Sequence, residues 1–205
     1  MAKSASPVAA APAAVSMRRI AVIGCAGAGK SVFSRELGER LGMPVTHLDT
    51  VYWRPGWNET PKTEWRETMD RLVEDERWLI DGNYGGTMDQ RLRAADTVVY
   101  LDTPRRVCLW RVVKRWATYR HKSRPDMAEG CPERMDFKFL RWIWQYPGAS
   151  RPKTLAALES KEQLGGQVYV LRSKDDIQRF LRIAAPATQP DVPTSSPDRQ
   201  GATGL

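Results

Sequence analysis

The stretch IAVIGCAGAGKS, residues 20–31, decides the fold of this 205-residue chain. Four apolar residues run into a glycine-rich turn, and Gly24, Gly29, Lys30 and Ser31 fit the spacing G-x-x-x-x-G-K-[ST]. The turn follows a predicted strand and precedes a predicted helix, which is the context that this motif requires. A glycine-rich turn can serve tight packing alone, but the Lys-Ser ending favours a phosphate-binding loop.

The chemistry of such a loop is the capture of an anion. Glycines let the backbone curl so that successive N–H groups point inward, and the following helix adds the positive end of its dipole. Residues expected to bind a nucleotide here are Gly24, Ala26, Gly27, Ala28, Gly29, Lys30 and Ser31. We expect Lys30 to reach the β- and γ-phosphates and Ser31 to ligate Mg²⁺, so the sequence predicts binding of Mg-ATP.

The rest of the chain alternates short apolar segments with helical patterns. Strands are predicted at 18–24, 44–49, 77–82, 97–102 and 167–172. Helices are predicted at 30–42, 61–75, 87–95, 104–120, 135–146, 152–161 and 174–184. This alternation indicates an α/β fold with a mostly parallel sheet covered on both faces, and it directs attention to the residues that follow each strand.

Three predicted strands end in aspartate, at Asp49, Asp81 and Asp102. A P-loop needs a second carboxylate near its metal. Asp81 is the best candidate, because an apolar and aromatic-rich run leads into it and GNYGG follows. We favour capping of the long basic helix for Asp102, whereas a functional role and a capping role are equally open for Asp49.

The positive charge of the chain lies mostly in one segment. The formal net charge is +8, and the stretch from Thr103 to Arg141 holds 11 Lys and Arg against 4 Asp and Glu, a local balance of +7. Three interpretations stay open: a solvated helix face, a phosphate clamp or a surface for nucleic acid.

Composition sets the outer limits. Length predicts one domain, which we place at 18–183, between a disordered leader at 1–17 and a disordered tail at 184–205; Met17 is an alternative start. No apolar run reaches the length of about 18 residues that spans a bilayer. The three cysteines and two histidines form neither a disulfide framework nor a zinc-ligand spacing, which fits a reducing, cytoplasmic setting.

Several segments resemble the nucleoside-monophosphate kinase group, which includes adenylate and shikimate kinases. They are LIDGNY after the third strand, an arginine-rich lid at about 119–136 and RSKDD after the last strand. More narrowly, HLDTVYWRPGW, DGNYGGTMDQRL and RPDMAEGCPERMDFKFLRWIWQYP resemble the bacterial DNA topology modulation proteins. The resemblance covers residues 18–183 and implies a three-layer P-loop fold whose five parallel strands have the order 2-3-1-4-5.

The resemblance also implies roles for particular residues. Asp49 is expected to orient or deprotonate an acceptor hydroxyl, and the lid is expected to bring arginines onto the transferred phosphoryl group. The lid candidates are Arg124 and Arg134, followed by Arg115 and Arg120 at the end of the preceding helix. Asp126 and Glu133 are expected either to pair with these arginines in the open state or to form surface salt bridges of little energy. Further expectations are Arg172 beside the nucleotide base, Asn83 and Tyr84 beside the acceptor, and Arg91 on the acceptor phosphate.

The segment at about 50–65 is shorter than the acceptor-binding domain of adenylate kinase. It offers Trp53, Trp57 and Tyr52 to stack on a base or sugar and Arg54 to grip a phosphate or carboxylate. Packing of a small lobe is an equal alternative for the tryptophans. For Trp142, Trp144 and Tyr146 at helical spacing, we favour a core role over stacking on nucleic-acid bases.

The sequence thus predicts a P-loop kinase that transfers the γ-phosphoryl group of Mg-ATP to a small acceptor, either a nucleotide or a hydroxylated metabolite. Two alternatives stay open. One is a nucleotide-dependent regulator that binds DNA through the basic segment, and the other is an ATPase switch. Guanine is disfavoured, because no N-K-x-D-like signature follows the fourth predicted strand.

Overall fold

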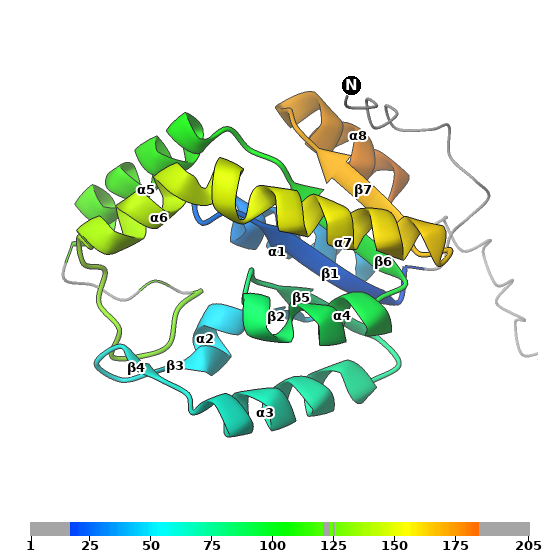
Figure 1. Ribbon diagram of the computed structural model, residues 1–205, viewed down its shortest axis with the longest axis horizontal. Helices are drawn as coiled ribbons and strands as arrows, with labels where there is room; N and C mark the ends of the chain where they lie inside the picture. The colour runs from blue at the N-terminus through cyan, green and yellow to red at the C-terminus, as the bar shows by residue number, and fades with distance from the viewer. Residues whose placement is uncertain (1–16, 121–123, 125, 185–205) are drawn as a thin grey trace, which may run out of the picture.

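A parallel five-stranded sheet forms the centre of the computed structural model, which describes residues 17–120, 124 and 126–184 (Figure 1). Its strands are β1 (Arg19–Gly24), β2 (Val45–His47), β5 (Trp78–Asp81), β6 (Thr97–Leu101) and β7 (Gln167–Leu171). They are arranged in the order β2-β5-β1-β6-β7, with every neighbouring pair parallel. Numbered along the chain within this sheet, the order is 2-3-1-4-5, which confirms the predicted fold class.

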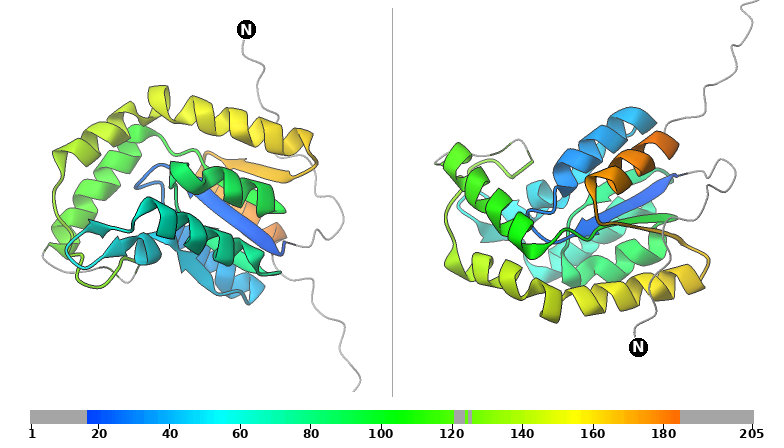
Figure 2. Two further views of the ribbon diagram at one scale, coloured as in Figure 1. Left: turned by 60° about the horizontal axis from the view of Figure 1, so that its bottom comes forward. Right: turned by 90° about the horizontal axis from the view of Figure 1, so that it is seen from above.

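Helices cover both faces of the sheet. Helices α1 (Lys30–Leu41) and α8 (Lys174–Ile183) lie on one face, while α3 (Lys62–Glu74), α4 (Met88–Ala94) and α7 (Arg151–Gln163) lie on the other (Figure 2). Strand β1 is buried from both sides: Ile20 and Val22 belong to one apolar cluster and Ala21 and Ile23 to a second. A continuous apolar run such as IAVI is what a central parallel strand requires.

Helices α5 (Arg105–Tyr119) and α6 (Phe137–Ala149) extend beyond the carboxyl ends of the strands (Figure 2). Between them runs the lid segment, residues 120–136, of which 121–123 and 125 lie outside the described residues. The lid segment lies beside a small hairpin of β3 (Trp53–Arg54) and β4 (Asn58–Glu59), where the Gly56 amide donates to the Gly130 carbonyl over 2.9 Å. The lid and hairpin therefore meet over the edge of the sheet at which ligands bind in α/β folds.

The second strand is shorter than predicted. It ends at His47, and the short helix α2 (Leu48–Tyr52) begins at once, so Asp49 lies in the first turn of a helix and not at a strand end. Leu48 is fully buried in the second apolar cluster, and a side chain at Gly82 would collide with it. Burial of Leu48 thus decides where the strand ends and the helix begins. The hairpin of β3 and β4 that follows α2 has no counterpart among the predicted elements.

The predicted cap of the long helix is wrong. The N-cap of α5 is Pro104, with no side-chain hydrogen bond. Asp102 instead accepts two hydrogen bonds from Arg151, at 2.8 Å from Nε and 2.7 Å from Nη2. Its carboxylate also lies 3.5 Å from Arg172 Nε. Two hydrogen bonds from a charged guanidinium bind a carboxylate more strongly than hydrogen bonds from neutral backbone amides do. The Asp102–Arg151 pair therefore joins the end of β6 to α7.

Other helix boundaries agree within one or two residues, apart from α6. This helix begins one residue after Asp136, whose Oδ1 accepts from the amides of Lys138 (2.8 Å) and Phe139 (3.2 Å). It continues through Pro147 to Ala149, where the sequence predicted an end at 146. The lost amide of Pro147 is tolerated because the helix stops within one turn and α7 starts directly after it.

The expected leader and tail lie outside the described residues, except for their innermost members. Met17 packs against the first apolar cluster, and Ala184 is buried in it. Both therefore belong to the folded domain. Within residues 17–120, 124 and 126–184, no helix is both long and apolar enough to cross a bilayer.

Candidate active site

A cleft of about 580 Å³ opens between the glycine-rich loop at residues 24–31, the lid segment and the hairpin. The loop contributes Ala26, Gly27, Gly29, Lys30 and Ser31. The edge of the sheet and α2 contribute Asp49, Asp81, Asn83 and Tyr84. The lid side contributes Arg115, Arg124 and Arg134. Residues that the sequence scatters over more than 100 positions thus line one space.

The loop needs its glycines. Gly27 and Gly29 have φ values of 77° and 101°, in the left-handed region that favours glycine. A Cβ atom at Gly27 would also collide with the carbonyl oxygen of Cys108 on α5. Helix α1 begins at Lys30 without a side-chain cap, so no side chain satisfies the amides of its first turn. These amides are available to an anion bound at the loop.

Two cations lie over the loop. Lys30 Nζ donates to the Cys25 carbonyl over 3.2 Å, and Arg111 Nη1 donates to the Ala28 carbonyl over 2.8 Å. Arg111 is not among the predicted site residues, although the sequence carries a signal for it. Arg111 and Arg115 are four residues apart on one predicted helix, so both project from the same face.

Asp81 lies at the end of β5, almost fully buried, and pairs with a histidine that the sequence analysis did not single out. His47 Nδ1 is 2.9 Å from Asp81 Oδ2, and the two residues are aligned in neighbouring strands. The hydrogen bond to Asp81 raises the pKa of His47, against the opposing effect of burial. His47 thereby fixes one carboxylate oxygen of Asp81.

Ser31 and Asp81 suit Mg²⁺ chemically, since both offer oxygen. Mg²⁺ is usually held by one or two protein oxygens, with waters and substrate phosphates completing its shell. Asp126 also contacts the Ser31 hydroxyl; burial raises the pKa of this carboxyl, but Arg124 and Ser31 together lower it below its ordinary value. Among the described residues no group of three or more histidine, cysteine or acidic side chains forms a larger metal site.

Asp49 and Tyr84 form the opposite side of the cleft. The Tyr84 hydroxyl donates to Asp49 Oδ1 over 2.6 Å. Burial and the nearby Asp49 carboxylate raise the pKa of Tyr84, so the phenol stays protonated and keeps donating. One oxygen of Asp49 is thereby oriented beside Trp53 and Asn83, which line the same cleft.

The lid arginines are engaged with acidic residues of the lid itself. Arg124 Nη1 lies 3.1 Å from Asp126, and its Nε lies 2.8 Å from Glu133 without the alignment of a hydrogen bond. Arg115 pairs with the same Glu133 at 2.9 Å. The side chains of Arg124 and Glu133 are almost fully buried, so these are not the solvated surface pairs that contribute little. Arg134 is exposed, and its guanidinium lies over the Trp57 ring at 5.1 Å.

Seven candidate site residues do not line the cleft. The Tyr52 ring packs against Trp53, Trp65 and Tyr84, and the Arg120 guanidinium lies 5.6 Å from the centre of the Trp116 ring. Gly24 and Ala28 belong to the loop but are packed inside the protein: a Cβ atom at Gly24 would collide with the Leu101 carbonyl oxygen, and Ala28 is buried. Arg54 pairs with Glu64 on α3, and Arg172 lies beside Asp102. Arg91 is fully buried and donates to the carbonyls of Gly82 (2.7 Å) and Tyr84 (2.9 Å). A buried guanidinium whose Nη1 and Nη2 atoms donate to backbone carbonyls supports the loop at 82–84 and cannot reach an acceptor phosphate.

The aromatic residues of α6 divide into three environments. Tyr146 is buried, as the core prediction requires. Trp142 stacks on Phe139 with a centroid separation of 6.0 Å and an interplanar angle of 7°, and both line the cleft. Trp144 is 46% exposed and lies under Arg105 at 3.9 Å. The core prediction is therefore wrong for Trp142 and Trp144.

Comparison with solved structures finds chains with a similar fold. Shikimate kinase from Acinetobacter baumannii in complex with shikimate is 18% identical, with a TM-score of 0.53 over 82% of this chain and 93% of that one. A gluconokinase from Sinorhizobium meliloti 1021 is 16% identical, with a TM-score of 0.48 over 82% and 90%. No family profile and no curated protein matches the sequence. At these identities the likeness concerns the fold alone.

Proposed function

We propose that the protein is a P-loop phosphotransferase that moves the γ-phosphoryl group of Mg-ATP to a hydroxyl group of a small acceptor. One observation carries the proposal: a single cleft combines the glycine loop and Lys30 with two oriented carboxylates, Asp49 and Asp81. Phosphoryl transfer needs positioning and charge neutralisation more than covalent help from the protein, and this cleft supplies both.

The loop side binds the donor. Its amides receive the β- and γ-phosphates, while Lys30 and Arg111 exchange their present carbonyl partners for phosphate oxygens. Both cations already contact the loop, so binding requires little side-chain rearrangement. Ser31 and Asp81 would hold Mg²⁺, which would supply positive charge to the phosphates. His47 keeps the Asp81 carboxylate in one orientation.

The acceptor side uses Asp49. One oxygen of this carboxylate accepts a hydrogen bond from the Tyr84 hydroxyl. The other oxygen accepts a hydrogen bond from the hydroxyl group of the substrate that receives the phosphoryl group. During transfer the acceptor oxygen forms a bond to the γ-phosphorus, the bond from that phosphorus to the β–γ bridging oxygen breaks, and the acceptor proton passes to Asp49. ADP and a phosphate monoester are the products.

The lid side supplies positive charge. Arg115, Arg124 and Arg134 already line the cleft. In the present arrangement Arg115 and Arg124 are neutralised by Glu133 and Asp126, and closure replaces these carboxylates with phosphate oxygens. Expulsion of water from the closed cleft strengthens each of these contacts.

A coupled assay of ADP release tests the proposal. The wild-type protein is supplied with Mg-ATP and, in turn, nucleoside monophosphates, nucleosides, sugars and amino alcohols, with Lys30→Ala as the blank. We expect one acceptor class to raise turnover well above hydrolysis by water, and Asp81→Asn to lower kcat by about 10- to 100-fold with a smaller change in nucleotide affinity. Turnover that no acceptor raises above the water rate would favour the ATPase switch instead.

The DNA-binding alternative, with membership of the topology modulation subfamily, has one observation in its favour. The outer face of α5 exposes Arg106, Lys114 and Trp110, the last being 62% exposed. Binding of a labelled DNA duplex at two salt concentrations, with and without ATP, separates the alternatives. A DNA-binding protein loses affinity steeply as salt rises, whereas a phosphotransferase needs no DNA.

A further inference from the structure

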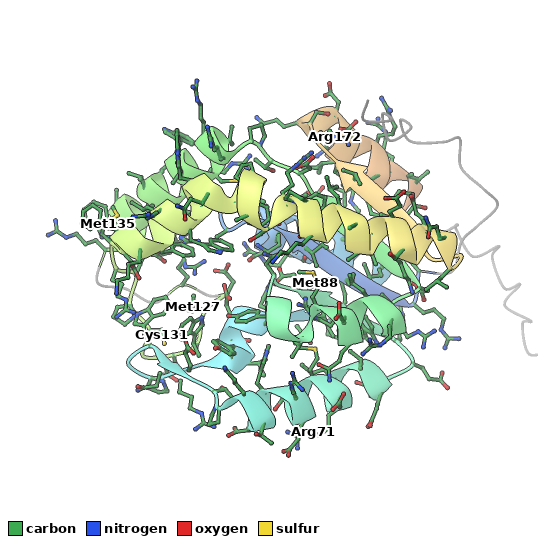
Figure 3. All side chains as sticks on the ribbon, viewed as in Figure 1. Arg71, Met88, Met127, Cys131, Met135 and Arg172 are labelled. Atoms are coloured by element: carbon green, nitrogen blue, oxygen red, sulfur yellow. The ribbon has the colours of Figure 1, made fainter. Side chains whose placement is uncertain are left out.

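One end of the cleft is lined by aromatic side chains and a carboxylate. This aromatic end consists of Asp49, Trp53, Trp57, Tyr84 and Met127. The rings of Trp53 and Trp57 meet edge to face at 5.2 Å, and both pack against the small cluster of Met127, Ala128 and Cys131. Figure 3 shows Met127 and Cys131 next to β3 and β4. These rings therefore border the same cleft as Asp49.

The charge of the aromatic end differs from that of the loop end. The hairpin contributes a single arginine, Arg54, and its guanidinium is drawn away to Glu64. Arg91 is buried behind Gly82 and Tyr84. Acceptors that carry a carboxylate or phosphate are normally held by an arginine fork. Neither α2 nor the hairpin of β3 and β4 directs an arginine into the cleft. The charged side chain that α2 directs into the cleft is the carboxylate of Asp49.

A cation already occupies part of this end. The guanidinium of Arg134 lies 5.1 Å from the centre of the Trp57 ring, within the range at which a ring face attracts a cation. Arg134 is exposed and belongs to the lid. When the lid arginines turn to the phosphates, the ring face becomes available to a cation of the acceptor.

The backbone at Trp57 supports a selected placement of this ring. Trp57 has φ 65°, and it is the only residue other than glycine with a positive φ in the described part of the chain. A bulky residue in the left-handed region is rare, and such residues persist where the surroundings hold them, often at binding sites. Here the indole Nε1 donates to the Pro132 carbonyl over 3.0 Å, which aims the ring toward the cleft.

We infer that the acceptor is a hydroxyl compound with a positively charged ammonium group, such as an amino alcohol or an amino sugar. The inference rests on the proposed phosphotransferase activity. The acceptor hydroxyl meets Asp49, and the ammonium group lies over the rings of Trp53, Trp57 and Tyr84. Aromatic rings beside a carboxylate are a common way to bind an ammonium group, and they disfavour an anion of the same size.

Three sugars of similar size provide the test: glucosamine, glucose and gluconate, with ethanolamine and choline as smaller ammonium compounds. Binding is measured by calorimetry without nucleotide, and turnover by ADP release. We expect at least one ammonium compound to bind about tenfold more tightly than glucose, and gluconate to bind least. Equal or tighter binding of gluconate overturns the inference, and so does the absence of binding by every ammonium compound at millimolar concentration.

Two variants separate recognition of a cation from support of the fold. Trp57→Leu removes the ring, and we expect the preference for glucosamine over glucose to disappear while glucose binding changes little. A merely structural ring would weaken both sugars alike. Arg134→Gln removes the competing cation and is expected to strengthen glucosamine binding, whereas an arginine that held an anionic acceptor would give the opposite result. Trp110→Leu, on the exposed face of α5, is the matched control, and each variant is first checked for folding by circular dichroism.

Calorimetric binding and ADP release together distinguish a failure of this inference from a failure of the proposed function. Preferential binding of an ammonium compound without any turnover would support an ammonium-binding site at the aromatic end, but it would contradict the phosphotransferase and with it the role of that compound as acceptor. Turnover of gluconate or of a nucleoside monophosphate in preference to ammonium compounds would sustain the phosphotransferase and remove the inference.

Discussion

At the scale of single residues, buried polar groups shape the cleft from behind. Arg91 shows this most clearly, because it is fully buried on α4 and satisfies the carbonyls of Gly82 and Tyr84. Burial lowers the pKa of Arg91 to about 10, so its guanidinium remains charged at neutral pH. The loop that carries Asn83 and Tyr84 into the cleft therefore depends on one cation that never reaches a ligand.

Replacement of Arg91 tests this dependence. In Arg91→Leu the two carbonyls lose their partner inside the protein, and we expect the free energy of unfolding to fall by about 2–4 kcal/mol. Urea denaturation followed by fluorescence measures the change. Arg93→Leu, two residues further on the same helix and exposed, is the control and is expected to change stability by less than about 0.5 kcal/mol. Equal losses in the two variants would contradict a special role for Arg91.

At the scale of elements, the lid segment and α5 are tied by ion pairs that neutralise the arginines of the cleft. Glu133 is the centre of this network, since it faces both Arg115 and Arg124. Its side chain is 5% exposed, so its negative charge acts through little water. The network stabilises the arrangement seen here and at the same time competes with any phosphate for the two guanidinium groups.

Removal of the charge at Glu133 is expected to separate these two effects. Glu133→Gln keeps the shape of the side chain but frees positive charge, so the affinity for Mg-ATP should rise on the order of threefold. The melting temperature should fall, because a buried ion pair loses one partner. Glu129→Gln, in the same segment but exposed, serves as the control for both measurements. Weaker nucleotide binding by Glu133→Gln would mean that the arginines do not face the donor phosphates.

At the scale of the whole molecule, Asp102 connects parts of the chain that lie far apart. It stands after β6 and pairs with Arg151 at the start of α7 and with Arg172 after β7. Burial alone would raise the pKa of Asp102, but the two arginines outweigh it and hold this pKa below its ordinary value. Folding is therefore linked to the ionisation of this one carboxyl.

The linkage predicts a pH dependence with a definite sign. Because the pKa of Asp102 is lower in the folded than in the unfolded chain, its contribution is fully present above about pH 4 and is lost as pH falls through the folded pKa. Urea unfolding of the wild type and Asp102→Asn should differ most near neutral pH and converge in acid. Asp75→Asn, at the exposed end of α3, should follow the wild type throughout. A difference that stays constant with pH would contradict the assignment.

The sequence by itself determined the features that arise from local patterns. The P-loop at Gly24–Ser31 follows from glycines next to Lys30, and the five strands follow from short apolar runs between helical patterns. For the same reason the ends of the predicted helices agree to within two residues, except that α6 continues three residues further; α2 was not predicted. Asp81 could be placed beside the loop, because neighbouring parallel strands end at one edge of the sheet.

Only the tertiary structure decided which charged groups face one another. The partners of Asp81, Asp102 and Arg91 are 34, 49 and 7–9 residues away in the sequence, and no local pattern selects them. Nor does a local pattern place Arg134 on the ring of Trp57. A buried charge takes the nearest partner that the packed chain offers, because leaving it unpaired is costly, and that choice exists only once helices and strands have come together.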